Sequence, residues 1–383
     1  MGKTYYIKRK GVCGVGDIFI TRIYIDKVRH LEDVLIELSE LQRKHLIITG
    51  KNGSGKTSLL EAMQDFVANA QDMGVAYYMN RKGGTRISFS PVPTSFSHYI
   101  FAYISVKRNV LSRPRAIKPI QISDKANIAA NVSKEFLNYI LGLDYQLYGA
   151  KSDSNKELEQ RLTKWFDNFL AALQNIYDCK DLKLIRDTKN LSFKIDMPGR
   201  EPFALHEMSD GYAAFLNIIM ELLMRLEEVD AVVDYQKSAI VMIDEIETHL
   251  HVEMQKRVLP FLTQMFPNVQ FIVATHSPFV ITSLENAIVF DLETKERLEK
   301  PSFYSYDTVV ESFLDTSMYS DELKRYFTRY KELCLKERTP EENDEFLRAK
   351  AELEIRAIPS TELYIAFQKL EKERKAAKNG TSA

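Results

Sequence analysis

The chain has 383 residues, of which 45% are hydrophobic and 27% are charged, a composition typical of globular proteins with enough apolar material for a core. Fifty-two Lys and Arg residues against 53 Asp and Glu residues give a formal net charge of -1. This excludes the strong overall positive field of many nucleic-acid-binding proteins. No apolar run approaches the roughly 18 to 20 residues of a membrane-spanning helix, and the first residues lack the apolar stretch of a signal peptide. We therefore expect a cytoplasmic protein without a membrane partner.

Three cysteines, Cys13, Cys179 and Cys334, are far apart in the sequence and form no CxxC pair. Disulfide frameworks and zinc sites both require paired or clustered cysteines. The spacing therefore predicts reduced thiols.

The first predicted elements are strands. Two apolar runs, 18–25 and 34–38, are rich in β-branched residues and predict antiparallel strands. A third run, 44–49, stops at Gly50, and the following glycine-rich turn opens into an apolar pattern of helical spacing from about residue 57. Strand, glycine-rich loop and helix is the order that a phosphate-binding site requires.

The middle of the chain mixes short strands with helices. Strands are predicted at 85–89 and 99–106, followed by a helical block with a broad apolar face between Asn155 and Tyr177. Core packing of a helical subdomain is the ordinary explanation of that face. Two short strands, 182–186 and 191–196, and a helix over 211–227 follow.

Two later strands, 239–243 and 269–274, are almost continuously apolar, which predicts a parallel sheet covered on both faces. They end at Asp244-Glu245 and Thr275-His276. Ligands of such sheets bind outside the carboxyl ends of the strands. The polar residues at these ends and the glycine-rich loop therefore predict one shared site.

Residues 50–57 read GKNGSGKT, which fits the phosphate-binding loop GxxxxGK[ST]. Backbone N–H groups of such a loop and the start of the next helix surround phosphate oxygens. Lys56 would contact the β and γ phosphates, and the Thr57 hydroxyl would bind Mg²⁺. A glycine-rich surface turn is the alternative. The candidate ATP-binding residues are Asn52, Gly53, Ser54, Gly55, Lys56, Thr57 and Ser58.

Asp244 and Glu245 carry the carboxylates that phosphoryl transfer requires. Asp244 would hold the Mg²⁺ shell, and Glu245 would orient or deprotonate the attacking water. His276 would donate a hydrogen bond to the γ-phosphate or to the water. The alternatives are an acidic pair that complements a helix dipole and a structural histidine.

A second candidate anion site is the start of the predicted helix over 211–227. Ser209 is a good N-cap, and Gly211 leaves the backbone open to close approach. The candidate residues are Ser209, Asp210 and Gly211, and an ordinary capped helix is the alternative.

These motifs together resemble the ABC-type ATPase family. GKNGSGKT is similar to Walker A, MSDGY at 208–212 to a diverged signature motif, AIVMIDE at 239–245 to Walker B, and His276 to the switch histidine. IDEIETHLH at 243–251 is similar to the SMC/RecF/OLD-like branch rather than to transporters. The resemblance covers most of residues 15–295.

The resemblance implies an α/β fold: an ABC-ATPase head with a mixed sheet, a P-loop core, a helical subdomain and an antiparallel β segment. It implies an ATPase domain over 1–300, with a helical insertion at about 125–180, and a charged helical region over 301–383. In this family two heads enclose two Mg²⁺-bound ATP molecules, each between one subunit's phosphate loop and the other's signature helix. We therefore expect a homodimer or higher homo-oligomer, with Glu247 and His249 near its seam.

Several departures narrow the family. Asp210 stands where transporters have Gly, no glutamine marks a Q-loop, and Arg108 is only a weak substitute. About 150 residues separate the phosphate loop from the signature, and about a hundred follow His276, too few for SMC coiled-coil arms or a Toprim nuclease domain. The chain is thus similar to ATPase components of bacterial anti-phage systems, of the Septu (PtuA-like) and PARIS (AriA-like) types, whose effector nuclease is a separate protein.

The leading hypothesis is an ATP-binding and hydrolysing switch, without a nuclease motif of its own, that controls a separate effector nuclease. A RecF/SMC-like DNA clamp is the alternative, so DNA stays open as a partner, and a transporter subunit is a third class. Dense alternating charge over 331–372 predicts a helical hairpin broken near Thr339-Pro340. A solvated face is its ordinary explanation, and docking of the effector is our hypothesis.

Overall fold

The computed structural model describes residues 18–73, 84–93, 99–105, 136–187, 190, 192–226, 238–310, 320–336, 338–356 and 362–380. The chain divides into two compact units, Met1–Val309 and Val310–Ala383, whereas the sequence analysis places the boundary at residue 300. Within the described ranges, no helix is both long and apolar enough to cross a membrane. Cys13, Arg108 and residues 125–135 of the predicted insertion lie outside these ranges.

The first unit contains a three-stranded antiparallel sheet in the order β2-β1-β4. It consists of β1 (Phe19–Val28), β2 (Leu31–Glu37) and β4 (Thr85–Ser90). Ile23 of β1 faces Ile36 of β2 and Ile87 of β4. The antiparallel strands predicted at 18–25 and 34–38 are confirmed, and β1 continues to Val28.

A six-stranded mixed sheet forms the centre of the unit, in the order β12-β11-β3-β10-β9-β5. Neighbours from β11 to β5 run parallel, and β12 pairs with β11 antiparallel. Every residue of β3, β9, β10 and β11 is buried, which confirms the predicted covered parallel strands. The strands are β3 (His45–Thr49), β5 (Ile100–Ser105), β9 (Ala239–Asp244), β10 (Val269–Ala274), β11 (Ala287–Asp291) and β12 (Arg297–Glu299).

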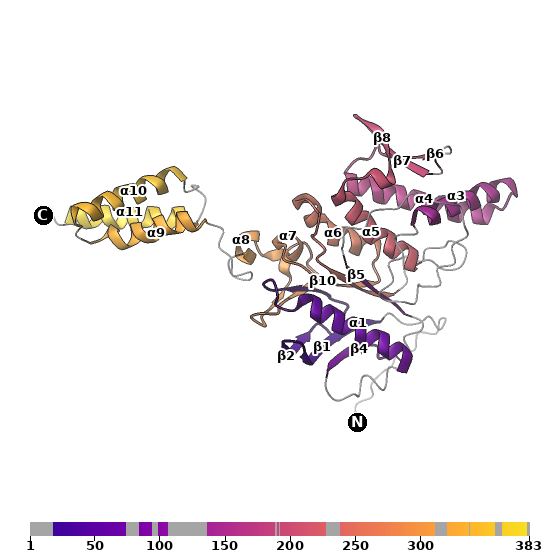
Figure 1. Cartoon of the computed structure of the whole chain (residues 1–383), viewed down its shortest axis with the longest axis horizontal. Coiled ribbons are helices and arrows are strands. Elements are labelled where there is room, and N and C mark those ends of the chain that lie inside the picture. Colours follow the sequence, from indigo (N-terminus) through magenta and orange to yellow (C-terminus); the bar gives the residue numbers. More distant parts are fainter. Residues whose placement is uncertain are drawn as a thin grey trace, which may run out of the picture. The chain divides into compact units, whose positions relative to one another are not determined.

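Helix α1 (Lys56–Met73) lies between the two sheets (Figure 1). Its buried Leu60 and Met63 share one core with Ile23 of β1 and Ile272 of β10. Helices α5 (Asp210–Leu226) and α6 (Val252–Met265) lie on the other face of the six-stranded sheet (Figure 1). The short helix α7 (Pro278–Ile281) follows β10, and α8 (Tyr306–Thr308) lies near the end of the unit. Both sides of the sheet are thus covered, as its apolar strands require.

The helical subdomain consists of α3 (Phe136–Ser152) and α4 (Lys156–Tyr177). Trp165 of α4 packs against both Phe136 and Phe169, with ring centroids 6.3 and 5.4 Å away, and these two rings also contact each other. The predicted apolar face of the helix is therefore a packing face. A small antiparallel sheet follows, formed by β6 (Lys183–Asp187), β7 (Ser192–Met197) and β8 (Arg200–Ala204).

The second unit contains α9 (Asp321–Cys334), α10 (Pro340–Arg356) and α11 (Glu362–Gly380). Tyr330, Phe346 and Phe367 form the centre of its own core. The predicted two-helix hairpin is therefore wrong: α10 begins at Pro340 as expected, but α11 adds a third helix. Leu363, Phe367 and Leu370 give α11 an apolar stripe that packs on the other two helices. The predicted α/β class with a helical C-terminal extension is confirmed.

Candidate nucleotide-binding and hydrolysis site

The loop between β3 and α1 requires glycine at particular positions. Gly50 and Gly55 have φ angles of +132° and +103°, a region that side chains with a Cβ rarely adopt. A Cβ atom on Gly50 would lie 2.8 Å from Ser54 Oγ, and one on Gly55 would lie 2.8 Å from Leu31 Cδ2. The close winding of this loop therefore depends on both glycines.

Lys56 begins α1 and is only 7% exposed. Its Nζ donates hydrogen bonds to the carbonyl oxygens of Gly50 (2.8 Å) and Lys51 (3.1 Å). Burial lowers the pKa of Lys56, and the carboxylates of Glu247 and Asp244 oppose that effect. The side chain thus lies across the loop, where a positive charge would meet phosphate oxygens.

Asp244 is the last residue of β9 and is buried. Thr57 Oγ1 donates a hydrogen bond of 2.8 Å to Asp244 Oδ2, and the Tyr103 hydroxyl also interacts with this carboxyl. Asp244 Oδ1 is buried and has no hydrogen-bond partner among the described residues. Burial raises the pKa of Asp244, and the hydrogen bond from Thr57 lowers it. A hydroxyl beside a carboxylate with an unpaired oxygen fits Mg²⁺, which binds oxygen ligands and keeps several waters.

No group of three or more His, Cys, Asp or Glu side chains forms a metal site within the described part of the chain. The candidate magnesium ligands are the hydroxyl and carboxylate oxygens of Thr57 and Asp244, which lie beside each other. Such a sparse set is typical of Mg²⁺ that is also held by substrate phosphates.

Glu245 is exposed and has a φ angle of +52°, which is unusual for a residue with a side chain and marks stored strain. Thr248 Oγ1 lies 3.4 Å from Glu245 Oε2 and donates to it. The strand thus ends abruptly at Asp244, and the next carboxylate projects toward solvent at the same edge.

His276 follows β10 and is half-buried. Its backbone N–H donates to Glu247 Oε1 at 2.7 Å. Burial and the charge of Lys56 lower the pKa of the His276 ring, and the carboxylate of Glu247 opposes this shift. The imidazole is therefore mainly neutral near pH 7 and offers one N–H donor.

The sheet brings the first group of predicted site residues together. Strands β3, β10 and β9 are neighbours and parallel, so the phosphate loop, His276 and the Asp244-Glu245 pair share one edge of the sheet. The role of each residue in catalysis stays a prediction.

The predicted signature residues lie at the start of α5. Ser209 and Asp210 are exposed, and the Ser209 carbonyl accepts a hydrogen bond of 2.9 Å from Ala213 N–H. Gly211 is buried, and a Cβ atom there would lie 2.7 Å from the His249 carbonyl oxygen. Within the chain, the start of α5 therefore packs against the loop that follows β9.

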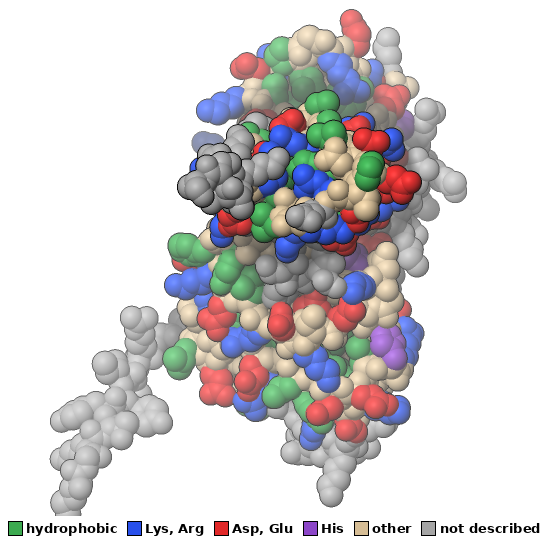
Figure 2. Space-filling view, turned by 90° about the vertical axis from the view of Figure 1, so that its left-hand side faces the viewer, with side chains coloured by type: hydrophobic (Ala, Val, Ile, Leu, Met, Phe, Trp, Pro, Cys, Tyr) green, Lys and Arg blue, Asp and Glu red, His purple; other side chains and the backbone are tan. Residues whose placement is uncertain are grey.

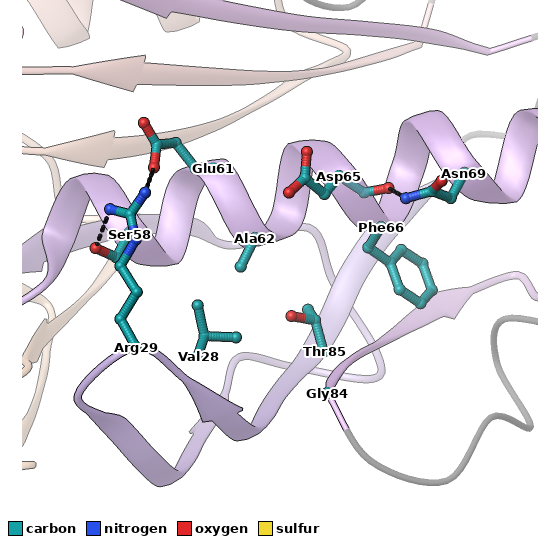
Figure 3. Close-up of a pocket in the computed structure, with 10 residues that line it drawn as sticks. All are labelled: Val28, Arg29, Ser58, Glu61, Ala62, Asp65, Phe66, Asn69, Gly84 and Thr85. Atoms are coloured by element: carbon teal, nitrogen blue, oxygen red, sulfur yellow. Dashed lines mark hydrogen bonds and ion pairs between the residues drawn. The ribbon is translucent and has the colours of Figure 1, made fainter.

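Sequence reasoning missed Arg29, in the turn between β1 and β2. Its Nη1 donates to Ser58 Oγ at 2.8 Å, and its Nη2 forms an ion pair of 2.8 Å with Glu61. Arg29 lines a pocket of about 240 Å³ between this turn and α1, beside Gly84 and Thr85 (Figure 3). A basic residue in a hairpin turn is a weak sequence signal, because only the fold brings it to Ser58.

Comparison with known proteins supports the motif analysis. Residues 102–282, which include the signature residues, Asp244, Glu245 and His276, match a family model described as "AAA domain, putative AbiEii toxin, Type IV TA system". The chain is 27% identical over 194 residues to the "Retron Ec83 probable ATPase" of Escherichia coli, covering 46% of this chain and 33% of that protein. It is 28% identical over 308 residues to "Septu protein PtuA" of Bacillus mycoides (strain KBAB4), covering 73% and 41%. The predicted resemblance to Septu-type ATPases is confirmed.

The chain thus spans only 33% and 41% of the length of these two relatives. Among solved structures, the SMC head domain from Thermotoga maritima is 16% identical, with a TM-score of 0.36, over 71% of this chain and 94% of that one.

Proposed function

We propose that this chain binds Mg²⁺–ATP and hydrolyses ATP to ADP and phosphate. The observation that carries the proposal is the hydrogen bond of 2.8 Å between Thr57 Oγ1 and Asp244 Oδ2. It joins the helix after the phosphate loop to the end of the strand that supplies the carboxylates. The name of one relative, "Retron Ec83 probable ATPase", supports the same activity.

In this proposal, loop N–H groups and Lys56 hold the β and γ phosphates, with Lys56 exchanging loop carbonyls for phosphate oxygens. The pocket that contains Asn52 and Gly53 of the phosphate loop, and is bordered by His30 and Leu292, receives the nucleoside half of ATP. Mg²⁺ supplies charge neutralisation when bound. Glu245 orients the attacking water and accepts its proton, and His276 donates a hydrogen bond to the γ-phosphate.

We propose further that two copies complete each site. Ser209 and Asp210 are exposed at the start of α5, so a second subunit can present its ATP to this helix end. The assembly is then a homodimer or a higher homo-oligomer that forms when ATP is bound, and Glu247 and His249 lie near its seam.

The proposed biological role is control of a separately encoded effector nuclease in anti-phage defence, with residues 310–383 as the docking unit. The similarity to retron and Septu proteins supports this role. The face of the molecule in Figure 2 shows acidic and basic side chains interspersed.

The main test replaces Glu245 with Gln. Glu245→Gln keeps the shape of the side chain but removes the proton-accepting charge, so phosphate release should fall by about 100-fold or more while ATP binding persists. Bound ATP should then remain unhydrolysed. Light scattering should show a shift toward dimers or larger assemblies when Mg²⁺–ATP is added. Glu253→Gln, at an exposed glutamate of α6, is the matched control. Wild-type turnover in Glu245→Gln would refute the catalytic role, and a mass independent of ATP would refute the coupling to assembly.

Composite sites are tested by mixing two inactive variants. Ser209→Trp should block hydrolysis by obstructing the partner's phosphate while sparing ATP binding, and Lys56→Ala should remove binding. A mixed assembly contains one intact composite site, so partial ATPase activity should return. Complete inactivity despite proven mixed assembly would contradict sharing of sites.

Docking of the effector is tested by truncation. A chain lacking residues 310–383 should bind ATP as the full chain does, because the phosphate loop and both catalytic strands lie in the first unit. Native pull-down should then lose the effector. Its retention would contradict the docking role.

A further inference from the structure

Two loops beyond the strand ends are linked through β10 and α6. These are the loop after β9, residues 245–251, and the turn after β10, residues 275–277. Ile246 N–H of the first loop donates to the carbonyl of Ala274, the last residue of β10, at 3.4 Å, and Ser277 Oγ of the turn donates to Gln255 Oε1 of α6 at 2.6 Å. Gln255 Nε2 in turn donates to the Leu250 carbonyl at 2.7 Å. Gln255 of α6 thus connects the turn that carries His276 to the loop after β9.

Glu247 contacts His276 itself. Its Oε1 accepts the His276 backbone N–H at 2.7 Å, a short, charge-assisted hydrogen bond. The backbone of Glu247 is itself held in its loop, because its carbonyl accepts a hydrogen bond from Leu250 N–H at 2.9 Å. Fixing the His276 N–H restricts the backbone at that residue and thereby the direction of its Cβ and imidazole.

A purely structural role explains Glu247 poorly. Its second oxygen, Oε2, is buried and has no hydrogen-bond partner within the described ranges. A buried carboxylate oxygen without a partner is costly, so packing alone would favour an apolar residue. Its charge acts on the site, since burial lowers the pKa of Lys56 and Glu247 is the carboxylate that most strongly opposes this shift.

We infer that Glu247 is a positioning residue, which fixes His276 for ATP hydrolysis through the bond between Oε1 and the His276 N–H. This inference rests on the proposed ATPase function. Glu247 acts through His276, whereas Glu245 acts on the water.

The contact is tested first without any turnover, by hydrogen exchange of the His276 amide in the full chain. Glu247→Ala removes the acceptor and should make this amide exchange about tenfold faster or more. Glu247→Gln keeps an amide oxygen as acceptor and should preserve protection, and Glu253→Ala is the matched control on the neighbouring helix. Unchanged exchange in Glu247→Ala would overturn the inference.

The functional consequence is tested by a double-mutant cycle on kcat. Glu247→Ala should lower kcat by about 10-fold to 100-fold, as loss of positioning does, with little change in KM for ATP. Glu247→Gln should recover most of that loss. In a His276→Ala background, Glu247→Ala should cost almost nothing further, because both changes remove the same contribution. Fully additive losses, or a kcat for Glu247→Gln as low as that for Glu247→Ala, would overturn the inference.

Failure of the proposed function gives a different pattern. In that case the wild-type chain shows no turnover with Mg²⁺–ATP. If only the inference fails, the wild-type chain turns over ATP normally, but Glu247→Ala leaves either the hydrogen exchange of the His276 amide or kcat unaltered.

Discussion

At the scale of single residues, Lys56 holds the position on which nucleotide binding depends. Its Nζ already donates hydrogen bonds to the carbonyls of Gly50 and Lys51. Transfer of these hydrogen bonds to phosphate oxygens should therefore cost little side-chain conformational entropy. Lys56→Ala removes charge-assisted hydrogen bonds of about 1.5–3 kcal/mol each, so ATP affinity should fall by about 100-fold or more. Isothermal titration calorimetry measures the loss.

The control for Lys56→Ala lies in the same loop. Lys51 is exposed and forms an ion pair with Glu293 at 3.1 Å, and such surface pairs contribute little. Lys51→Ala should change ATP affinity by less than about threefold, which is under 1 kcal/mol. An equally small change in Lys56→Ala would refute the phosphate-loop assignment.

The residues of the site differ in how far the sequence predicts them. Gly50, Lys56 and Thr57 follow from a local motif, because loop and helix start are contiguous in the chain. Glu247 and Arg29 act through contacts across strands: Glu247 meets His276 29 positions away, and Arg29 meets Ser58 at the same separation. Spacing alone carries no information about such contacts, so Arg29 was missed and Glu247 was placed only near a seam.

At the scale of elements, the packing of α5 depends on the absence of a side chain at Gly211. A Cβ atom there would meet the backbone oxygen of His249 at 2.7 Å, and backbone cannot yield as a side chain can. Gly211→Ala should therefore lower the free energy of unfolding by about 1–3 kcal/mol. Urea unfolding measures the change.

Gly142 provides a matched control for this substitution. It lies within α3, and a Cβ atom there meets nothing within 4 Å. Gly142→Ala should stabilise the protein by about 0.5–1 kcal/mol, because alanine loses less backbone entropy in a helix. Equal effects at the two glycines would contradict the close packing of α5 on the loop after β9.

The elements that the sequence predicts well are those with a distinctive pattern. The runs 239–243 and 269–274 are continuously or almost continuously apolar and correspond to β9 and β10, and the apolar stripe of α4 spans most of its length. Strand β11 was missed because the five-residue run AIVFD is too short to separate strand from helix, whereas the equally short β3 is followed by the phosphate-loop motif that identifies it. Helix α11 was missed because its few apolar residues give a weak helical pattern in the sequence, and their packing on α9 and α10 is evident only in the fold.

At the scale of the whole molecule, the two units have separate cores and should lose stability in different pH ranges. In the first unit, His45 is buried, and its Nδ1 accepts Phe271 N–H at 3.1 Å. Burial, with the charges of Arg43 and Lys44, lowers its pKa to about 4. Protonation therefore favours the unfolded chain, so this contribution is complete above about pH 6.5 and is lost as the pH falls toward about 4, by up to roughly 1.4 kcal/mol per pH unit.

Trp165, the one tryptophan of the sequence, reports unfolding of the first unit. Between pH 7 and pH 5, the urea midpoint from its fluorescence should fall less steeply in His45→Gln, which keeps an acceptor but does not titrate. His251→Gln, at an exposed histidine, should retain the wild-type slope. Identical slopes in all three proteins would show that His45 is not responsible.

In the second unit, Glu371 is 6% exposed and lies among three donors. Arg374 Nε and Lys350 Nζ lie 2.9 and 3.3 Å from its oxygens, and Tyr330 Oη donates to Oε1. Burial raises the pKa of the Glu371 carboxyl, but the hydrogen bonds from Arg374, Tyr330 and Lys350 outweigh it and lower the pKa to about 2.

Because the folded pKa of Glu371 lies below its unfolded value, its contribution is present above about pH 4.5 and is lost as the pH falls toward 2. On acidification, the first unit should therefore weaken before the second. Urea titrations read by pulsed hydrogen exchange of peptides from 321–380 should give Glu371→Gln a lower midpoint at pH 7 and a flatter decline between pH 4.5 and 2. Glu373→Gln, exposed on the same helix, should behave as wild type. If the urea midpoint of Glu371→Gln falls as steeply as that of the wild type between pH 4.5 and 2, the acid sensitivity of the second unit arises from other carboxylates.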